Sequence, residues 1–285
     1  MTPCRGDILQ ILRNEPMKNR TTLRIGGRVR ELIIPESEEE LMECAGRADL
    51  ILGRGSNLLV ADGELDICVV STEMLRDIVF DGDKVTAGAG VTLTELAVKC
   101  AERGLGGLEF AHGIPGSVGG AIFMNAGAYG GEMKDVITSV RAITGGKIVD
   151  IPNAECGFSY RASRFQQGGI VASATFKLRR RDEGEIRAKM RELGDKRREK
   201  QPLEFPSAGS TFKRPEGYFA AALIEEAGLK GAAVGGAQVS EKHAGFLINR
   251  GGATFEDFTA LMEKVQREVY SRSGVELEPE VRIIK

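Results

Sequence analysis

The stretch FAHGIPGSVGGAIFMNAGAYGG, Phe110–Gly131, contains no acidic residue, lysine or arginine in 22 residues. Its length allows a membrane span, but seven of its residues are glycine and Pro115 interrupts it. The run instead predicts a neutral, glycine-rich wall in a soluble protein, where missing side chains let a flat or extended ligand approach the backbone. Ser117 and Asn125 supply polar groups there. The alternative is a tight β-turn region packed on itself.

A second glycine-rich segment, GRGSN at Gly53–Asn57, follows a strand expected at LILG from Leu50. Successive N–H groups in such a turn form an anion-binding nest, and Arg54 and Ser56 can add a charge and a hydroxyl donor. The pattern is neither GxGxxG nor a P-loop, and an ordinary strand-ending turn is the alternative. Two such segments in one chain favour a large cofactor with a diphosphate.

The composition narrows the class of protein. A chain of 285 residues is long enough for about two domains. The 39 Lys and Arg residues nearly balance 41 Asp and Glu, which gives no indication of a nucleic-acid or membrane partner. Five widely spaced cysteines without a CxxC pair predict reduced thiols and no metal site. The N-terminus MTPCRGDILQ is not typical of a signal peptide, so we expect a cytoplasmic protein.

Three capping patterns predict helices. They pair Ser37 with Glu40, Thr92 with Glu95, and Thr254 with Asp257. Gly104 is the expected end of the second helix and Gly274 of the third. The third helix carries an apolar stripe formed by Phe258, Leu261, Val265 and Val269.

Segments rich in β-branched residues predict strands. They lie near 136–144, 147–151 and 169–178, and a short last strand carries EVRII. The charged segment 179–201 predicts a solvated helix. The pattern is α plus β, and its character changes near residues 180–200.

Two short segments contain charged side chains suited to binding. In CGFSYRASRF, Tyr160 and Arg161 are adjacent, and the guanidinium fork of a buried arginine suits a carboxylate. A surface Tyr–Arg pair is the alternative. In LEPEVR, Glu278 and Glu280 flank Pro279 before the last strand. Strand alternation would turn either Glu280 or its neighbour inward, although such glutamates usually face solvent.

Ser210 lies among small residues in PSAGSTFKRP. A nucleophilic serine needs a base within hydrogen-bond reach. The two histidines, His112 and His243, lie in unrelated segments, and the chain has no GxSxG elbow. A serine hydrolase is therefore disfavoured.

In this order, GRGSN, GIPGSVGG…NAGAYG, GFSYR, PSAGSTFK and LEPEVR resemble the UDP-N-acetylenolpyruvoylglucosamine reductase (MurB) family of flavoenzymes. The resemblance covers nearly the whole chain. It implies an α+β fold with an FAD-binding domain of the PCMH (vanillyl-alcohol-oxidase-like) type over 18–181. A smaller α+β substrate domain over 196–275 and a returning C-terminal strand over 276–285 would follow. The short connection between GFSYR and PSAGS resembles the shorter form of the family, which lacks an inserted substrate loop.

The resemblance also implies an activity: NADPH reduces non-covalently bound FAD, which reduces the enolpyruvyl group of a UDP-sugar in peptidoglycan precursor synthesis. Arg161 would hold the enolpyruvyl carboxylate, Glu280 would complete that polar cluster, and Ser210 would donate a proton. The implied cofactor-binding residues are Gly53, Arg54, Gly55, Ser56, Asn57, Pro115, Gly116, Ser117, Gly119, Gly120, Asn125, Ala126 and Gly127. The implied substrate-binding residues are Tyr160, Lys200 and Lys213.

Two positions depart from the family pattern. His112 stands before GIPG where many relatives have a small residue, and Arg214 follows Lys213 where some members carry asparagine. For Lys200 and Lys213, structural salt bridges are an equal alternative to diphosphate binding. His243 favours a structural role. An FAD-dependent oxidase of the same fold and a non-catalytic flavin-binding protein are the alternative functions, and no obligate protein partner is implied.

Overall fold

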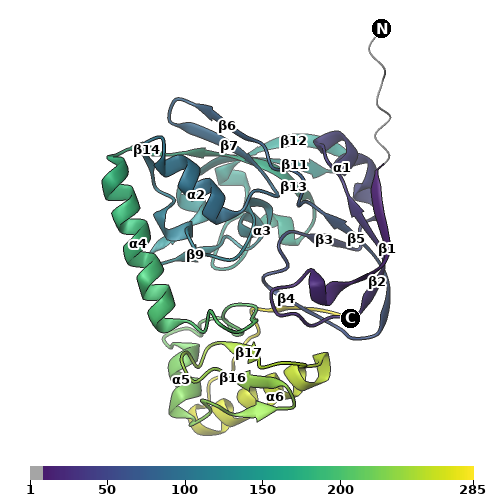
Figure 1. The fold of residues 1–285 in the computed structure, drawn as a ribbon, viewed down its shortest axis with the longest axis vertical. Helices are drawn as coiled ribbons and strands as arrows, with labels where there is room; N and C mark the ends of the chain where they lie inside the picture. Colours follow the sequence, from purple (N-terminus) through teal and green to yellow (C-terminus); the bar gives the residue numbers. More distant parts are fainter. Residues whose placement is uncertain (1–8) are drawn as a thin grey trace. The chain divides into compact units, whose positions relative to one another are not determined.

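The computed structural model describes residues 9–285 (Figure 1). Cys4 and the rest of the expected N-terminal segment before residue 9 lie outside these residues. The four described cysteines are free, in agreement with the reduced thiols expected from sequence, and all four are buried. Burial raises the pKa of the Cys100 thiol to about 12. Within residues 9–285 no helix is long and apolar enough to cross a membrane.

The described chain divides into two compact units. The first unit contains residues 9–15, Val29–Gly53 and Asp66–Ala188. The second contains Pro16–Arg28, Arg54–Leu65 and Lys189–Lys285. Two early segments thus belong with the C-terminal third of the chain. Domains defined as continuous stretches of sequence cannot describe this arrangement. The domain boundaries 18–181, 196–275 and 276–285 stay a prediction.

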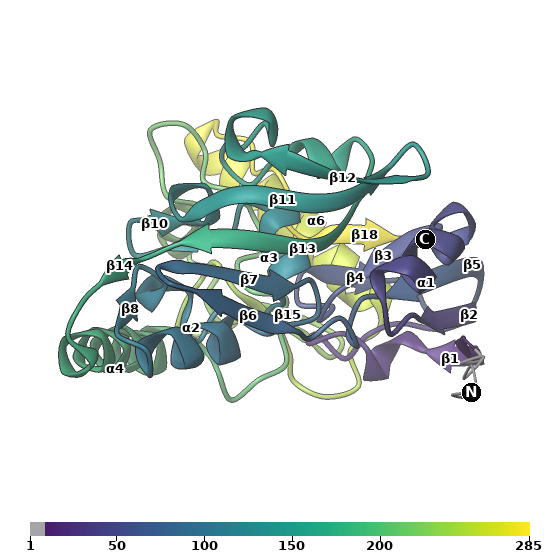
Figure 2. The same cartoon turned by 90° about the horizontal axis from the view of Figure 1, so that it is seen from above.

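The first unit is built on a five-stranded antiparallel sheet of order β12-β11-β13-β7-β6 (Figure 2). Its strands are β6 (Ile78–Asp81), β7 (Lys84–Gly88), β11 (Ile137–Thr144), β12 (Lys147–Pro152) and β13 (Ile170–Lys177). The three strands predicted near 136–144, 147–151 and 169–178 are therefore confirmed. Apolar side chains such as Phe176 are fully buried on this sheet.

A second sheet, of order β1-β2-β5-β3, lies mainly in the first unit. Its strands are β1 (Gln10–Pro16), β2 (Arg28–Ile34), β3 (Leu50–Leu52) and β5 (Glu64–Ser71), and β3 runs parallel to β5. The strand expected at LILG is β3, and it ends directly before Gly53. A short pair joins β8 (Leu105–Gly106) to β14 (Arg179–Arg180).

The helices of the first unit begin where their caps predict. Ser37 precedes α1 (Glu38–Cys44), and its Oγ accepts the Glu40 N–H at 3.1 Å. Thr92 precedes α2 (Leu93–Ala101), and its Oγ1 accepts the Glu95 N–H at 3.2 Å. The expected end at Gly104 was wrong by two residues, because α2 ends at Ala101 rather than at Arg103 and a turn leads on to Gly104 at φ +63°. A third helix, α3 (Val118–Phe123), packs on β13.

The second unit pairs an early strand with the last one. β4 (Leu58–Val60) runs parallel to β18 (Arg282–Ile284). A three-stranded antiparallel sheet contains β15 (Ala233–Val234), β16 (Ala237–Val239) and β17 (Leu247–Asn249). Val281 is buried before β18 while Glu280 is half-buried, so alternation turns the valine inward.

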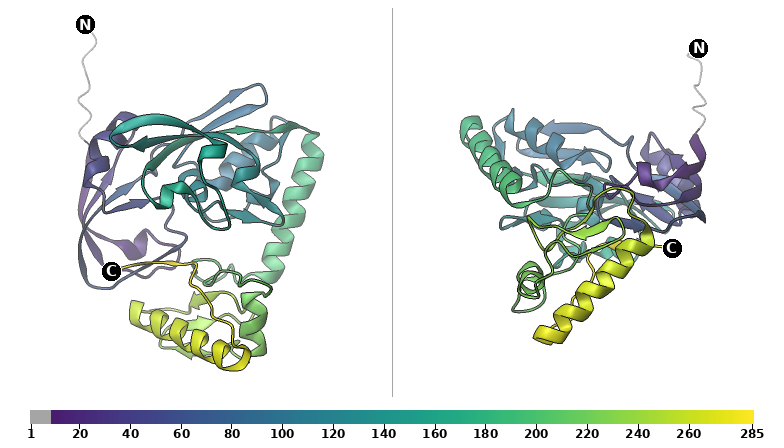
Figure 3. Two further views of the ribbon diagram at one scale, coloured as in Figure 1. Left: turned by 180° about the vertical axis from the view of Figure 1, so that it is seen from behind. Right: turned by 60° about the horizontal axis from the view of Figure 1, so that its bottom comes forward.

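Helices α5 (Ala220–Glu226) and α6 (Phe255–Ser273, yellow in Figure 3) pack around this small sheet. The predicted stripe of α6 is confirmed, because Phe258, Leu261, Val265 and Val269 are all buried in one core. Gly274 ends α6 at φ +69°, a left-handed conformation that glycine adopts without steric cost. The charged segment 179–201 forms α4 (Glu183–Lys200), of which Glu183–Ala188 belongs to the first unit and the rest to the second.

The capping box of α6 yields a stability prediction. Thr254 Oγ1 accepts the Asp257 N–H at 3.0 Å, and Asp257 Oδ2 accepts the Thr254 N–H at 3.1 Å. We expect Thr254→Ala to lower the free energy of unfolding by about 1 kcal/mol, since it removes one half of the box. Urea unfolding monitored by circular dichroism measures this.

The matched control is Thr259→Ala inside the same helix. There Oγ1 donates only to the helix carbonyls of Phe255 and Glu256, and alanine has a higher helix propensity than threonine. Equal losses for both variants would contradict the capping argument.

Candidate active site

Gly53 and Gly120 lie on either side of the Ser117 hydroxyl in the first unit. A Cβ placed on Gly53 would lie 2.5 Å from Ser117 Oγ and 3.8 Å from the Gly120 nitrogen. Ser117 is 1% exposed, and its hydroxyl has no hydrogen-bond partner within the described chain. Buried polar atoms are nearly always paired, so an orphaned hydroxyl beside bare backbone fits a polar ligand group. The contact of these three residues with a cofactor stays a prediction.

Other predicted glycines are required by the protein's own packing. A Cβ on Gly119 would lie 2.9 Å from Ala89 Cβ, and one on Gly127 would lie 2.6 Å from the Gly131 carbonyl oxygen. In the second unit Gly55 has φ +60°, and a Cβ there would lie 2.1 Å from the Arg20 oxygen. Gly127 thus packs within its own glycine-rich stretch, whereas Gly119 and Gly55 pack against other segments, and the contact of all three with a cofactor stays a prediction.

The remaining residues predicted from the glycine-rich segments differ in exposure. Arg54 and Pro115 are exposed, whereas Ser56 and Gly116 are half-buried. Ala126 uses both backbone groups within the protein, because its N–H donates to Ala121 and its carbonyl accepts from Met133. Their contact with a cofactor stays a prediction.

Asn125 is a fully buried junction between three segments. Its Nδ2 donates to Glu132 Oε2 at 3.0 Å and to the Ser159 carbonyl at 2.9 Å. Its Oδ1 accepts the Lys134 N–H at 3.0 Å. Both amide hydrogens and the amide oxygen are therefore engaged by the protein, which favours a positioning role for this side chain over the cofactor contact expected from sequence.

The hairpin of β9 (Gly127–Ala128) and β10 (Gly131–Glu132) follows Asn125. Its two-residue loop has φ +53° at Tyr129 and φ +87° at Gly130, the signs of a type I′ turn. The sequence AYGG in the glycine-rich stretch is thus explained by hairpin geometry.

Arg161 occupies a strained position in a neighbouring turn. Ser159 and Ala162 exchange two backbone hydrogen bonds, of 3.0 and 3.2 Å, around Tyr160 and Arg161. Arg161 has φ +55° and Tyr160 has no positive φ, the signs of a type II turn, in which glycine is the usual residue at the arginine's position. A strained non-glycine residue that carries a chemically active side chain is a candidate for a functional role.

The Arg161 side chain lies half-buried beside the hairpin. Its Nη2 donates to the Gly127 carbonyl at 3.4 Å, and its guanidinium lies 5.2 Å from the Tyr160 ring centre. The Lys134 ammonium, 2.8 Å from Glu132, holds the pKa of that carboxyl below its ordinary value, together with the hydrogen bond from Asn125 and a smaller effect of Arg161. An ionised carboxylate therefore stands within electrostatic range of the arginine.

In the second unit, Thr211 fixes the segments that contain Ser210 and Glu280. Its N–H donates to the Gly245 carbonyl at 2.9 Å, and its carbonyl accepts the Glu280 N–H at 2.8 Å. Its Oγ1 accepts the Leu247 N–H at 3.2 Å. Thr211 is 1% exposed. Two of the three predicted catalytic residues are thus adjacent, in sequence or by hydrogen bond, to one buried residue.

Asn57, the last residue of GRGSN, holds the Glu280 segment from the other side. Its Nδ2 donates to the Glu280 carbonyl at 3.1 Å, and its own carbonyl accepts the Arg282 N–H at 3.0 Å. The sequence assigned Asn57 to the cofactor, and that contact stays a prediction. Its observed bonds connect the GRGSN turn with the C-terminal strand.

The predicted substrate-binding residues lie on the surface or in ion pairs. Tyr160 is exposed, as is Lys200 at the end of α4. The Lys213 ammonium forms an ion pair with Glu278, and its N–H donates to the Glu278 carbonyl at 2.8 Å. For Lys213 the salt bridge considered from sequence is therefore present.

Sequence reasoning missed the polar residues that support the Ser210 loop. Thr22 Oγ1 donates to the Ser207 carbonyl at 2.7 Å. Asn249 is buried, and its Nδ2 donates to the Leu23 carbonyl at 3.1 Å. The Thr22 bond spans 185 positions of sequence and the Asn249 bond spans 226, so no local pattern signals them.

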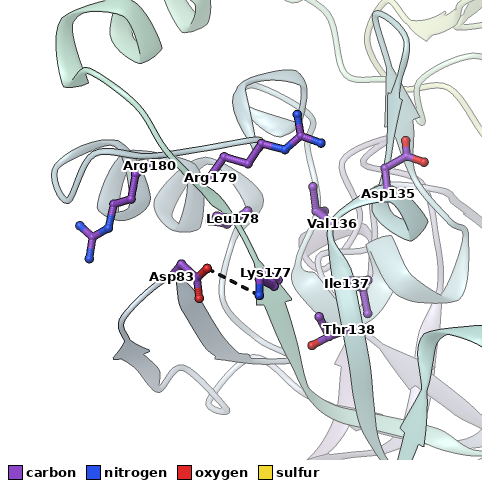
Figure 4. A pocket seen from close by; sticks show the side chains of 9 residues that line it. All are labelled: Asp83, Asp135, Val136, Ile137, Thr138, Lys177, Leu178, Arg179 and Arg180. Carbon is purple, nitrogen blue, oxygen red and sulfur yellow. Dashed lines mark ion pairs between the residues drawn. The ribbon is translucent and has the colours of Figure 1, made fainter.

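Figure 4 shows a surface pocket of about 540 Å³ in the first unit. It is lined by Asp83, Asp135, Val136, Ile137, Thr138, Lys177, Leu178, Arg179 and Arg180. Lys177 and Asp83 form an ion pair of 3.7 Å there. The pocket contains none of the predicted site residues. Among residues 9–285 no cluster of His, Cys, Asp and Glu is suited to a metal ion.

Known proteins identify the family of this chain. Residues 201–284 match the C-terminal domain of UDP-N-acetylenolpyruvoylglucosamine reductase, and residues 30–151 match an FAD binding domain. The UDP-N-acetylenolpyruvoylglucosamine reductase of Caldanaerobacter subterraneus subsp. tengcongensis is 48% identical over 279 residues, which are 95% of this chain and 92% of the relative. That of Pediococcus pentosaceus is 49% identical over 284 residues, or 97% of this chain and 95% of the relative.

This chain belongs to the UDP-N-acetylenolpyruvoylglucosamine reductase (MurB) family. The crystal structure of the MurB enzyme from Thermus caldophilus superposes with a TM-score of 0.87 at 38% identity, covering 98% of this chain and all of that one. The α+β fold with an FAD-binding domain is thereby confirmed, and so is the identification as an FAD-dependent oxidoreductase of peptidoglycan synthesis. The bare backbone at Gly53 and Gly120 and the orphaned Ser117 hydroxyl fit this cofactor.

The strain at Arg161 predicts an unusual order of stabilities. A left-handed conformation costs a non-glycine residue about 1 kcal/mol or more, and glycine avoids this. We expect Arg161→Gly to be about 1 kcal/mol more stable than Arg161→Ala in urea unfolding. At Arg164, which has no positive φ, the order should reverse, because glycine has more backbone freedom to lose. If the glycine variant were the more stable one at both positions, or the alanine variant at both, the strain at Arg161 would be refuted.

His243 predicts a pH dependence of stability. Its Nδ1 accepts the Gly245 N–H at 3.1 Å, and burial lowers its pKa below the ordinary 6.5. The unfolded chain then binds the proton more tightly, so the stabilising contribution of the neutral ring is complete above pH 6.5 and is lost as pH falls through the lower folded pKa. We expect the stability difference between wild type and His243→Gln to shrink between about pH 7 and 5. His112 is common to both proteins and cancels. A difference independent of pH would contradict this reasoning.

Proposed function

We propose that this chain reduces the enolpyruvyl group of UDP-N-acetylglucosamine-enolpyruvate to UDP-N-acetylmuramate in the cytoplasm, with NADPH as electron donor. The proposal is supported by relatives of nearly the same length that are named for this reductase activity. When bound, FAD supplies the two-electron carrier between the nicotinamide and the alkene. The observation that carries the assignment of residues is the strained Arg161 in GFSYR.

Arg161 would bind the carboxylate of the enolpyruvyl group. A guanidinium presents parallel N–H donors that match a carboxylate in a bidentate pair. Bound in this way, the carboxylate is a better electron sink when charge develops on the adjacent carbon. The strained backbone at Arg161 supports this role, since strained residues are often found at functional sites.

Ser210 would supply the proton that completes the reduction. After hydride reaches one alkene carbon, charge on the other resembles an enolate, which is basic enough to take a proton from a well-placed hydroxyl. A serine in this role needs no neighbouring base, because it gives its proton away. The bonds of Thr211 support the role, because they fix the backbone directly after Ser210.

Glu280 would complete the polar cluster around the substrate carboxylate. Its backbone is held by Thr211 and by Asn57, so its side chain starts from a fixed point. The orphaned hydroxyl of Ser117 and the bare backbone of Gly53 and Gly120 would hold FAD. Lys213 would reach the diphosphate of the substrate by exchanging its pair with Glu278, and the surface residues Tyr160 and Lys200 would contact the substrate.

The test of this function separates the two half-reactions of Ser210→Ala by stopped-flow absorbance of the flavin. Reduction by NADPH needs no proton donated to the sugar, so its rate should stay close to wild type. Reoxidation by the enolpyruvyl substrate should slow roughly a hundred- to ten-thousand-fold, the contribution of a positioned general acid.

The matched control is Ser207→Ala in the same loop, where only the backbone carbonyl makes a hydrogen bond of 2.7 Å, accepting it from Thr22. It should leave both rates unchanged. Reoxidation of Ser210→Ala at the wild-type rate would assign the proton to another group, with a protonated Glu280 next in line. Rapid reoxidation by oxygen without any response to the sugar would point to an oxidase.

A further inference from the structure

The Arg161 turn, residues 159–162, is closed by two backbone hydrogen bonds between Ser159 and Ala162. The Tyr160 side chain in this turn is exposed. Because the left-handed conformation of Arg161 is unfavourable for a side-chain-bearing residue, it persists only where the surroundings impose it. Two side-chain amides from outside the turn do so.

Gln166 holds the peptide of Arg161 itself. Its Nε2 donates to the Arg161 carbonyl at 2.9 Å and to the Phe123 carbonyl at 3.0 Å. Phe123 is the last residue of α3, and its carbonyl also accepts Ser163 Oγ at 2.8 Å. The exit of the turn is therefore fastened to the end of a packed helix, and the orientation of the Arg161 carbonyl is fixed.

Asn125 holds the entry of the same turn. Its Nδ2 donates to the Ser159 carbonyl at 2.9 Å. Asn125 is the second residue after the end of α3 and has a left-handed φ of +42°. Its second amide hydrogen binds Glu132, which links the turn to the hairpin whose Gly127 carbonyl accepts from Arg161. Both ends of the turn thus depend on residues at the C-terminal end of α3.

We propose that Gln166 and Asn125 are positioning residues for Arg161: they impose the left-handed turn that presents the guanidinium to the substrate carboxylate. The inference rests on the proposed role of Arg161. Neither amide needs to touch the substrate or the cofactor. Gln166 is exposed and binds only main-chain carbonyls and Met124 Sδ, and the amide of Asn125 is fully engaged by the protein.

The first test uses Gln166→Ala, because an exposed side chain can be removed without unfolding the protein. Losing its bonds lets the turn leave the strained conformation, so KM for the sugar substrate should rise about two- to ten-fold, the usual weight of such bonds. Flavin reduction by NADPH should not change. The matched control is Gln167→Ala, the same residue type one position on, also exposed. An unchanged KM in Gln166→Ala, or an equal rise in Gln167→Ala, would overturn the proposal.

The second test asks whether Gln166 acts through Arg161. In an Arg161→Ala background the guanidinium is absent, so adding Gln166→Ala should have no further effect on the substrate half-reaction. If Gln166 had a purely structural role, Gln166→Ala would reduce the rate of the substrate half-reaction by the same factor in both backgrounds. If Arg161→Ala alone leaves reoxidation by substrate unchanged, the proposed role of Arg161 fails. If Arg161→Ala is impaired but the two losses simply add, only the positioning role fails.

The third test separates positioning from cofactor binding at Asn125. Asn125→Asp keeps the acceptor for the Lys134 N–H but loses both donors, and it faces the Glu132 carboxylate. We expect KM for the sugar to rise by more than in Gln166→Ala, with the affinity for FAD unchanged in titrations of apoprotein followed by flavin fluorescence. Weakened FAD binding with an unchanged KM would make Asn125 a cofactor residue and overturn its part of the proposal.

Discussion

Arg161, Ser210 and Glu280 all lie outside helices and strands, so their positions depend on how the peptide groups of their loops are paired. A loop provides no regular ladder of backbone bonds, and its buried N–H and carbonyl groups must find other partners. In this chain, side chains and peptide groups of other segments supply them. The Asn125 side chain serves the Arg161 turn in the first unit. In the second unit the Thr211 carbonyl and the Asn57 amide serve the Glu280 segment, and the Thr211 N–H, directly after Ser210, donates to Gly245. The arrangement of the functional groups follows from these few bonds.

Burial strengthens this control. Asn125 and Thr211 are at most 1% exposed, and an unpaired buried polar group costs about 1–3 kcal/mol. Each loop therefore has one arrangement in which all partners are satisfied and few others of similar free energy. Preorganisation of this kind suits a reduction in which hydride and proton must reach neighbouring carbons of one substrate.

The sequence predicted the parts of the fold that local chemistry decides. The helix starts at Ser37, Thr92 and Thr254 are set by hydrogen bonds within one turn, and all three are confirmed. The end of α2 was wrong because Gly104 marks the later turn. Pro16–Arg28 belongs to the second unit because it contacts residues far away in sequence. No hydrophobic periodicity in the sequence predicts such contacts.

Short sequence motifs predicted which residues belong to the candidate site, but not what each of them contacts. Glycine patterns identified bare backbone, but they did not distinguish Gly53, where an orphaned hydroxyl lies near, from Gly119, which packs on Ala89. The pattern also assigned Asn125 to the cofactor, since an asparagine among glycines resembles a ligand contact. Its three protein partners come from segments seven or more residues away, beyond the reach of a motif.

The free energies involved explain how an arginine can occupy a position suited to glycine. The left-handed conformation costs roughly 1–2 kcal/mol, while each side-chain hydrogen bond contributes about 0.5–1.5 kcal/mol. The bonds from Gln166 to Arg161 and from Asn125 to Ser159 together are about enough to offset the strain, and one alone is marginal. A glycine would relieve the strain but would carry no guanidinium, and moving the arginine to a relaxed neighbouring position would turn its side chain in another direction. In the strained turn, the backbone conformation therefore fixes the direction of the Arg161 side chain. Because this conformation depends on the amides of Gln166 and Asn125, substituting either amide tests whether the position of the guanidinium matters for the reaction.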